Sequence, residues 1–181
     1  GVDIEDLLLG CAYPEGEQGL NLGRISTYLA GLPNSVPGMT TNRLCGSSMQ
    51  VIHTAAGNIA FGSGDVFICA GVESMSRVMR GGFNRTPHPH IEATYTDAYI
   101  SMGITAENLA NSHQISRSNQ EQFAALSHSK AIQAQKNGFL SDEIVSISNT
   151  TTDGCMREPN LEKMSQLSPA FIESGTVTAA T

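Results

Sequence analysis

Basic side chains and long apolar runs are both scarce in this sequence, and each shortage excludes a class of function. No apolar run among the 181 residues approaches the ~20 residues that a membrane-spanning helix requires. No signal-peptide pattern is found at the start. Ten basic residues stand against 17 acidic ones, and the formal net charge of −7 disfavours nucleic acid as the main partner. We therefore predict no membrane span and no nucleic-acid partner.

Cysteine is sparse as well, and its spacing excludes two kinds of site. The four cysteines are Cys11, Cys45, Cys69 and Cys155, and they form no Cys-x-x-Cys motif. Neither a disulfide framework nor a zinc site is predicted. His88-Pro89-His90 lacks a third ligand nearby, so we predict an exposed loop there and no metal ion. Unpaired cysteines indicate a reducing, intracellular compartment. We take this as the bacterial cytoplasm, with a mitochondrion or a peroxisome as alternatives.

The charges are unevenly distributed along the chain. Residues 1–76 contain two basic and seven acidic side chains, whereas residues 77–181 contain eight basic and ten acidic ones. A polyanionic ligand would therefore find most of its cationic partners in the second stretch. The composition also changes there, because residues 77–99 are rich in Gly, Arg, Thr, Pro and His and predict a long loop.

Residues 1–76 show the pattern of an α/β protein. The predicted elements are a strand over 6–12, a helix over 20–32, an extended segment over 35–40, a helix over 49–60 and a strand over 65–71. The last strand is continuously apolar, which is typical of a parallel sheet covered on both faces. Strands that alternate with helices in this way predict the α/β class.

The second stretch predicts mainly helices. A short helix is expected over 105–113, and a longer one over 117–137 begins after the N-cap Ser116 and ends at Gly138. Residues 143–147 predict a strand, and residues 150–166 predict an irregular segment. Residues 175–178 begin a new element at the end of the chain.

Cys45 is the most informative single residue. It lies in Thr41-Asn42-Arg43-Leu44-Cys45-Gly46-Ser47-Ser48-Met49-Gln50, where a polar turn with a glycine leads into an apolar helix. The positive end of the helix dipole and the unpaired N–H groups there would stabilise a thiolate. A thiolate in that position is a candidate nucleophile. The alternative is a cysteine that only packs in the core.

Several sequence blocks resemble one protein family. They are 42–50 around Cys45, Ala70-Gly71-Val72-Glu73-Ser74-Met75-Ser76, Met102-Gly103-Ile104-Thr105-Ala106-Glu107-Asn108, Ser116-Arg117, Phe123-Ala124, Asp142-Glu143-Ile144-Val145 and Gly175-Thr176-Val177-Thr178-Ala179. In this order they resemble the N-terminal half of the thiolases. The Ser-Ser-Met-Gln form after the cysteine resembles the degradative 3-ketoacyl-CoA thiolases (acetyl-CoA acyltransferases) in particular.

The resemblance implies a thiolase fold with five layers, α/β/α/β/α, of which this chain is an incomplete, N-terminal part. Residues 1–76 would belong to the N-terminal core, although the opening strand and helix of the family are missing. Residues 77–174 would form the inserted loop domain that binds CoA. Residues 175–181 would start the strand that returns to the core.

The resemblance also implies a reaction, the thiolytic cleavage of 3-ketoacyl-CoA to acetyl-CoA and a shortened acyl-CoA in fatty-acid β-oxidation. Cys45 matches the nucleophile that carries the acyl group. Met102 matches a residue along the pantetheine arm, and Arg157 a basic residue at the CoA nucleotide. The alternative for Met102 is a methionine that packs in the core, and the alternative for Arg157 is a solvated arginine of a loop. CoA is a substrate here, and no cofactor is predicted.

Partners and completeness follow from the same resemblance. Thiolases form homodimers or homotetramers, and some belong to β-oxidation complexes. In the family, a histidine that activates the cysteine and a second cysteine come from the C-terminal half, whose motifs are absent here. We therefore expect these 181 residues alone to be inactive. The alternatives are an incomplete fragment that only binds a ligand or a subunit, and a condensing enzyme, either an acetoacetyl-CoA thiolase or a ketoacyl synthase.

Overall fold

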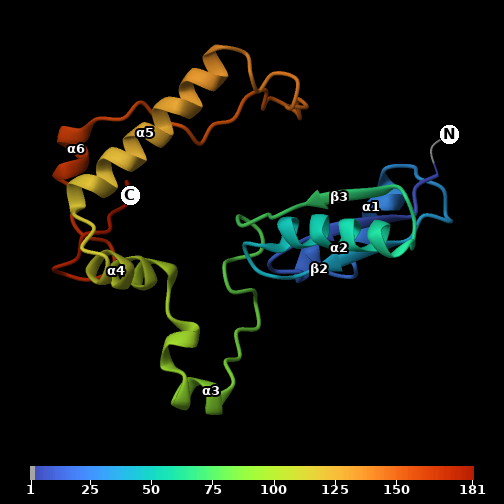
Figure 1. The fold of residues 1–181 in the computed structure, drawn as a ribbon, viewed down its shortest axis with the longest axis horizontal. Helices are drawn as coiled ribbons and strands as arrows, with labels where there is room; N and C mark the ends of the chain where they lie inside the picture. Colours follow the sequence, from blue (N-terminus) through green and yellow to red (C-terminus); the bar gives the residue numbers. More distant parts are fainter. Residues whose placement is uncertain (1–2) are drawn as a thin grey trace. The chain divides into compact units, whose positions relative to one another are not determined.

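The computed structural model describes residues 3–181 (Figure 1). These residues form two compact units, the first ending at Thr86 and the second comprising Pro87–Thr181. Within the described residues, no helix combines the length and the apolar character needed to cross a membrane.

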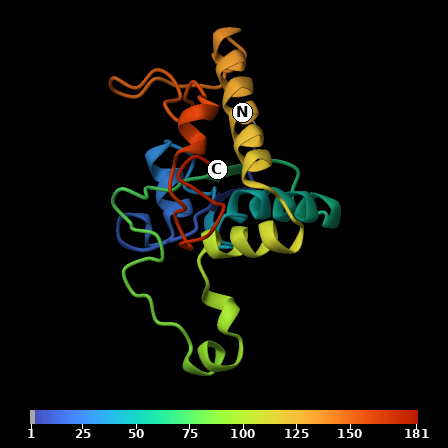
Figure 2. The same ribbon diagram turned by 90° about the vertical axis from the view of Figure 1, so that its left-hand side faces the viewer.

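The first unit has three layers. In chain order its elements are β1 (Asp6–Gly10), the 3-10 helix η1 (Gly16–Gln18), α1 (Leu22–Leu29), β2 (Gly38–Thr41), α2 (Ser47–Phe61) and β3 (Phe67–Gly71). The strands pair in parallel in the order β2-β1-β3. Parallel crossovers are right-handed, and β2 and β3 flank β1 on opposite sides. Helices α1 and α2 therefore cover opposite faces of the sheet (Figures 1 and 2).

The central strand β1 supplies the core of this unit. Leu7, Leu8 and Leu9 are at most 5% exposed, as expected for a strand paired on both edges and covered on both faces. Leu8 packs with Val51 and Ala55 of α2 in one cluster. The helix that follows Cys45 is thus fixed to the sheet by apolar contact.

Helix α1 approaches β2 so closely that glycine is required on both sides of the contact. A Cβ atom at Gly23 would lie 2.6 Å from the carbonyl carbon of Met39. A Cβ atom at Gly38 would lie 2.6 Å from the backbone nitrogen of Arg24. Both neighbours are backbone atoms, so they cannot rotate away as a flexible side chain would.

We expect Gly23→Ala to destabilise the first unit by about 1–3 kcal/mol, because the added methyl forces α1 away from β2. Amide hydrogen exchange of the β1 and β2 residues measures this as a lower free energy of opening. Gly57→Ala is the matched control. A Cβ at Gly57, inside α2, meets no atom within 4 Å, and we expect that variant to be unchanged or slightly more stable. Equal protection in the two variants would contradict the close contact.

The second unit consists of helices and the segments that join them. Its elements are α3 (Pro89–Thr94), the 3-10 helix η2 (Thr96–Tyr99), α4 (Met102–Ser112), α5 (Arg117–Lys136) and α6 (Leu161–Ser165). Three helices begin at a polar N-cap whose side chain accepts a hydrogen bond from a backbone N–H. The pairs are Ser101 with Ile104 at 3.3 Å, Ser116 with Asn119 at 3.2 Å, and Asn160 with Lys163 at 2.9 Å.

Two buried carboxylates organise the second unit. Glu121 pairs with Arg117 at 2.5 Å on α5, and the same arginine donates to the carbonyls of Met164 and Leu167 at 2.8 and 2.9 Å. Arg117 therefore ties the end of α6 to α5. Glu107 of α4 accepts hydrogen bonds from the backbone near the end of the chain, which brings residues 175–181 onto α4.

The observed elements confirm the predicted α/β class and most of the predicted helices and strands. Three predictions for the second stretch are wrong. Residues 143–147 form no strand, and only a single bridge joins Ile147 and Thr150. Residues 150–166 are not wholly irregular, since they contain α6, and the predicted loop over 77–99 contains α3 and η2.

The predicted limits of the CoA-binding loop domain, residues 77–174, stay a prediction. The two compact units divide after Thr86, and residues 77–86 pack with the first unit, where Val78 is fully buried. Residues 175–181 contain a turn at Ala179 and Ala180, and their role as the start of a returning core strand stays a prediction.

Candidate active site

Cys45 lies at the tip of a tight turn immediately before α2. The N–H of Gly46 donates to the carbonyl of Arg43 at 3.0 Å, and the N–H of Ser47 donates to the carbonyl of Leu44 at 3.0 Å. The hydroxyl of the buried Ser47 accepts from the N–H of Arg43 at 2.9 Å. The turn is closed by these bonds, and the Cys45 side chain remains exposed.

The residue before the cysteine has an unusual backbone conformation. Leu44 has a φ of 47°, in the left-handed region that residues with a Cβ rarely adopt. Such a conformation costs about 1–3 kcal/mol and is found mainly at functional sites. The N–H and the hydroxyl of Ser47 both donate to the carbonyl of Leu44, at 3.0 and 2.5 Å, and these bonds hold Leu44 in this conformation. The strained turn presents Cys45 outward.

Cys45 lines a cavity of about 400 Å³ at the carboxyl ends of β1 and β3. Gly10 and Gly71, the last residues of those strands, lie in its wall, and the helix start contributes Ser47 and Ser48. A Cβ atom at Gly10 would lie 2.6 Å from the backbone nitrogen of Ser48. Glycine at the strand end therefore lets α2 begin directly against the sheet. In open α/β sheets the carboxyl ends of the strands are the usual place of ligand binding.

The start of α2 offers hydrogen-bond donors to this cavity. Among residues 3–181, the backbone N–H groups of Ser48 and Met49 have no acceptor. Unpaired N–H groups and the helix dipole favour negative charge at this end of the helix. An oxygen that gains negative charge during a reaction is stabilised in such a place.

The remaining wall of the cavity comes from the loops after the two strands. Ala12 and Tyr13 follow β1, and Glu73, Met75 and Arg80 follow β3. From the sequence, none of them is assigned a catalytic or binding role, and Met75 and Arg80 are expected to line a domain junction. The signal that could have found Glu73 is a carboxylate two residues beyond a continuously apolar run that predicts a strand; in the structure this strand, β3, is an edge strand with half-buried and exposed residues.

Cys11 is close to this site but is not a second nucleophile. It is 1% exposed, and burial raises the pKa of its thiol, with the negative charge of Glu73 as an additional cause. Its Sγ donates to Glu73 at 3.8 Å. Cys11 therefore remains a thiol and acts as a small packing residue.

The structure places the two predicted CoA-binding residues in the second unit. Arg157 lines a cavity of about 790 Å³, together with His128 and Lys163. The backbone N–H of Arg157 donates to Nδ1 of His128 at 3.1 Å. Met102 is the first residue of α4, is exposed, and is not among the residues that line this cavity. The roles of Cys45, Met102 and Arg157 stay predictions.

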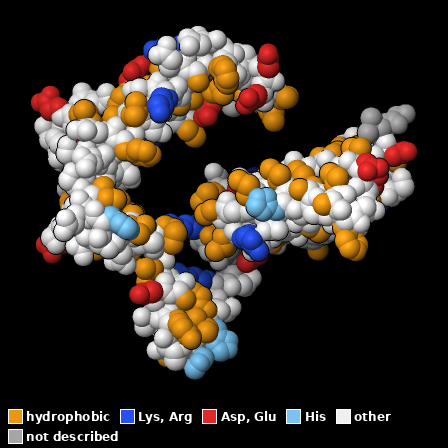
Figure 3. Space-filling model, in the orientation of Figure 1, with side chains coloured by type: hydrophobic (Ala, Val, Ile, Leu, Met, Phe, Trp, Pro, Cys, Tyr) orange, Lys and Arg blue, Asp and Glu red, His pale blue; other side chains and the backbone are white. Residues whose placement is uncertain are grey.

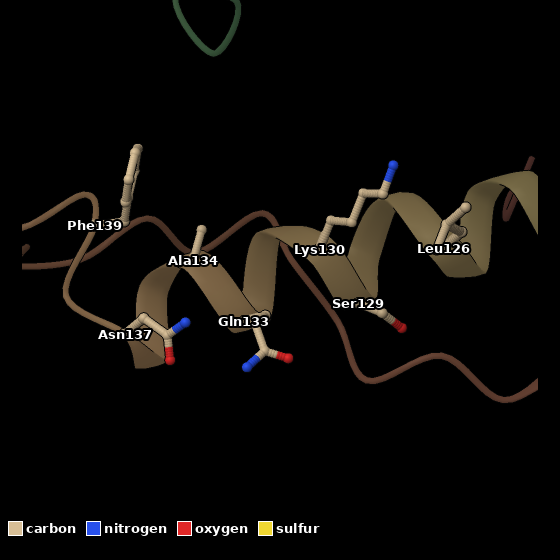
Figure 4. A pocket seen from close by; sticks show the side chains of 7 residues that line it. All are labelled: Leu126, Ser129, Lys130, Gln133, Ala134, Asn137 and Phe139. Atoms are coloured by element: carbon tan, nitrogen blue, oxygen red, sulfur yellow. The ribbon is translucent and has the colours of Figure 1, made fainter.

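A shallow groove of about 490 Å³ follows α5 in the second unit (Figure 4). Leu126, Lys130, Ala134 and Phe139 point to one side of the helix there. The opposite side shows Ser129, Gln133 and Asn137. Lys130 is its only charged group, so this groove carries no catalytic constellation.

The face of the first unit that carries α2 is rich in exposed apolar side chains (Figure 3). Met49, Ile52 and Ile59 of α2 are 61%, 53% and 47% exposed. Apolar faces of this kind are typical of surfaces that pack against another part of a protein or against a partner.

As for metal sites, no group of three or more potential ligands is found in the part of the chain that the structure describes.

Comparison with known proteins gives one consistent result. The family described as "Thiolase, N-terminal domain" matches residues 2–181. The 3-ketoacyl-CoA thiolase of Psychrobacter arcticus is 44% identical over 191 residues, which cover 99% of this chain and 48% of that protein. The 3-ketoacyl-CoA thiolases of Marinomonas sp. and Bacillus subtilis are 42% and 40% identical, with 99% and 98% of this chain covered and 48% and 50% of theirs. The chain spans about half the length of these relatives.

Proposed function

Since the chain belongs to the thiolase family, we propose that it carries, in Cys45, the nucleophile of an acyltransferase that cleaves 3-ketoacyl-CoA with CoA. The observation that supports this most directly is the position of Cys45. It stands exposed on a strained turn, lines a cavity at the carboxyl ends of β1 and β3, and lies beside the free N–H groups at the start of α2. A nucleophile needs this combination of access and nearby positive potential.

In the proposed reaction the Cys45 thiolate attacks the C3 carbonyl carbon of the substrate and forms a tetrahedral alkoxide. The alkoxide collapses with cleavage of the C2–C3 bond, and the electron pair passes to C2, which takes up a proton and leaves as acetyl-CoA. The shortened acyl group remains on Sγ as a thioester. The thiolate of free CoA then attacks the thioester carbon, the bond to Sγ breaks, and acyl-CoA leaves with Cys45 again a thiolate.

The test is mass spectrometry of the protein before and after mixing with acetyl-CoA, done on this chain and on the gene product that contains it. We expect one acetyl group on the complete gene product, located on Cys45 by peptide mapping. Cys69→Ser, which removes an exposed thiol outside the cavity, should leave the adduct unchanged. Absence of the adduct, or iodoacetamide labelling of Cys45 no faster than of Cys155, would overturn the proposal.

The wider biological setting is part of the same proposal. We place the reaction in fatty-acid β-oxidation in the bacterial cytoplasm, with CoA as substrate and without a resident cofactor. The active protein would be a homodimer or homotetramer and could join a β-oxidation complex. The apolar face of α2 supports an additional packing partner for the first unit.

Arg157 and Met102 are proposed to bind the CoA substrate, and Arg157 offers the clearer test. A guanidinium forms strong hydrogen bonds with phosphate, so Arg157→Ala should weaken CoA binding by roughly tenfold in titration calorimetry. Lys130→Ala is the control, because Lys130 is a cation of the same unit outside the 790 Å³ cavity. CoA affinity that survives Arg157→Ala unchanged would remove Arg157 from the site.

One observation favours a second candidate function for the isolated chain. It spans 48–50% of the relatives, so the separate 181 residues would bind a ligand or a partner without turnover. If addition of a segment that corresponds to the other half of these relatives restores no activity, this candidate replaces the enzyme. The condensing alternative receives no such support, since the three relatives are named 3-ketoacyl-CoA thiolases.

A further inference from the structure

The loops after β1 and β3 are joined by a hydrogen-bond network centred on Glu73. One oxygen of its carboxylate accepts from the N–H of Ala12 at 2.7 Å, and the other accepts from the N–H of Tyr13 at 3.3 Å. The side-chain amide of Gln18 donates to Glu73 at 2.9 Å. Glu73 is exposed as a residue because it lines the cavity, yet both its oxygens are occupied by donors from the neighbouring loop.

Gln18 is the buried member of this network. It is 2% exposed, although its amide is a polar group. The NH₂ group donates to the carbonyl of Tyr13 at 2.9 Å as well as to Glu73, and the carbonyl oxygen accepts from the N–H of Ser74. A buried amide with all these partners is held in one orientation. Each loop is therefore bonded to the other through Glu73 and through Gln18.

The network bears directly on the Cys45 cavity. Ala12, Tyr13 and Glu73 all line that cavity, and none of them belongs to a helix or strand. Loops without such ties move on the nanosecond to microsecond timescale. The Glu73 carboxylate restricts the motion of the loop through charge-assisted hydrogen bonds from the N–H groups of Ala12 and Tyr13. Such bonds are about twice as strong as neutral ones.

We propose that Glu73 is a positioning residue that holds the cavity wall around Cys45 in the geometry needed for acyl transfer. This inference rests on the proposed role of Cys45. Glu73 does not exchange a proton with the substrate here. Its role is to fix Ala12 and Tyr13, so that a bound thioester meets Cys45 in a reactive orientation. A misplacement of about 1 Å caused by a residue that does not itself react can lower a rate by roughly a hundredfold.

The test measures how fast acetyl-CoA acylates Cys45 in the complete gene product. Glu73→Gln keeps the side-chain size but turns one acceptor oxygen into a donor that would face another donor. We expect the maximal acylation rate to fall by roughly 10- to 100-fold, with the half-saturating acetyl-CoA concentration nearly unchanged. Glu73→Asp keeps both acceptor oxygens and should retain more of the rate than Glu73→Gln.

The control is Glu17→Gln, an exposed carboxylate of the same unit that pairs with Arg77 at 2.5 Å outside the cavity. Its acylation rate should match that of the parent.

Two outcomes for the acylation rate overturn the inference. Glu73→Gln could react as fast as the parent, or Glu73→Asp could react no faster than Glu73→Gln. The inference also fails if Glu73→Gln lowers the acylation rate only where the buried Cys11 also becomes reactive to an alkylating reagent. The lower rate would then come from local unfolding and not from a misplaced cavity wall. If the parent itself is not acylated, the proposed function fails and the inference with it. If the parent is acylated and only the Glu73 variants disagree, the inference alone fails.

Discussion

Replacing Cys45 by alanine is expected to abolish thiolysis of 3-ketoacyl-CoA by the complete gene product, with a loss in kcat of roughly a thousandfold or more. The mechanism requires a covalent thioester on Sγ, and alanine offers no atom to carry the acyl group. The loss should appear in kcat, because Met102 and Arg157, the residues proposed to bind CoA, remain in place. A coupled assay of acetyl-CoA release measures it.

Two further variants separate the chemistry from the fold. Cys45→Ser keeps the size of the side chain, but its hydroxyl is a far weaker nucleophile, so its activity should be nearly as low as that of Cys45→Ala. Cys69→Ser removes another exposed thiol of the first unit and should retain nearly full activity. More than about a tenth of the parent activity in Cys45→Ala would contradict a covalent mechanism through this residue.

The first unit could be predicted from the sequence because its local signals agree with one another. The apolar run over 65–71 contains β3, and the apolar residues after Cys45 form α2 and end at Gly62 with a φ of 79°. The same holds for α5 in the second unit. Ser116 caps its start by accepting a hydrogen bond from the N–H of Asn119, and Gly138, with a φ of 72°, follows its end. Periodicity and end signals are properties of neighbouring residues, so a sequence contains them.

The errors arose where the structure depends on distant partners or on weak signals. Residues 143–147 have the β-branched composition of a strand, but no second strand lies beside them, and Val145 and Ile147 remain exposed. A strand needs a partner for its backbone, and a sequence pattern does not provide one. Helices α3 and α6 were missed because they are one to two turns long. Pro89 at the first turn and the N-cap Asn160 were their only end signals.

Some residues of the candidate site could be predicted from the sequence and others could not, for the same physical reason. Cys45 could be predicted because the turn and the helix that present it are adjacent in the sequence. Glu73 and Gln18 could not, because their roles come from hydrogen bonds to residues more than 50 positions away. Glu107 was missed for the same reason. Its position one turn after Gly103 and one turn before Ala110 placed a carboxylate on the buried face of α4, which was the available signal.

Loss of the Glu107 carboxylate is expected to destabilise the second unit strongly. It is 6% exposed and accepts hydrogen bonds from the N–H of Thr176 at 2.9 Å, the hydroxyl of Thr176 at 3.1 Å and the N–H of Val177 at 2.8 Å. In Glu107→Gln the new NH₂ group would face these donors, and at least one buried N–H would lose its acceptor. We expect a loss of roughly 2–4 kcal/mol in the free energy of unfolding. Urea titration followed by helical circular dichroism measures it, with the exposed Glu162→Gln as the control, which should change little.

The pH dependence gives the same contact a second, independent signature. Burial would raise the pKa of Glu107, but the hydrogen bonds from Thr176 and Val177 and the positive charge of Arg117 outweigh it, so the pKa is lowered. A lowered pKa in the folded state means that the unfolded chain binds the proton more readily. The stabilisation is therefore complete above the unfolded pKa of about 4.3 and is lost as the pH falls through the folded value. As the pH falls below this unfolded value, the parent should lose a part of its stability that Glu107→Gln has already lost, so the two stability curves should converge in acid. Parallel curves would show that the carboxylate gains nothing from its charge, and that the contact to residues 175–181 depends on packing alone.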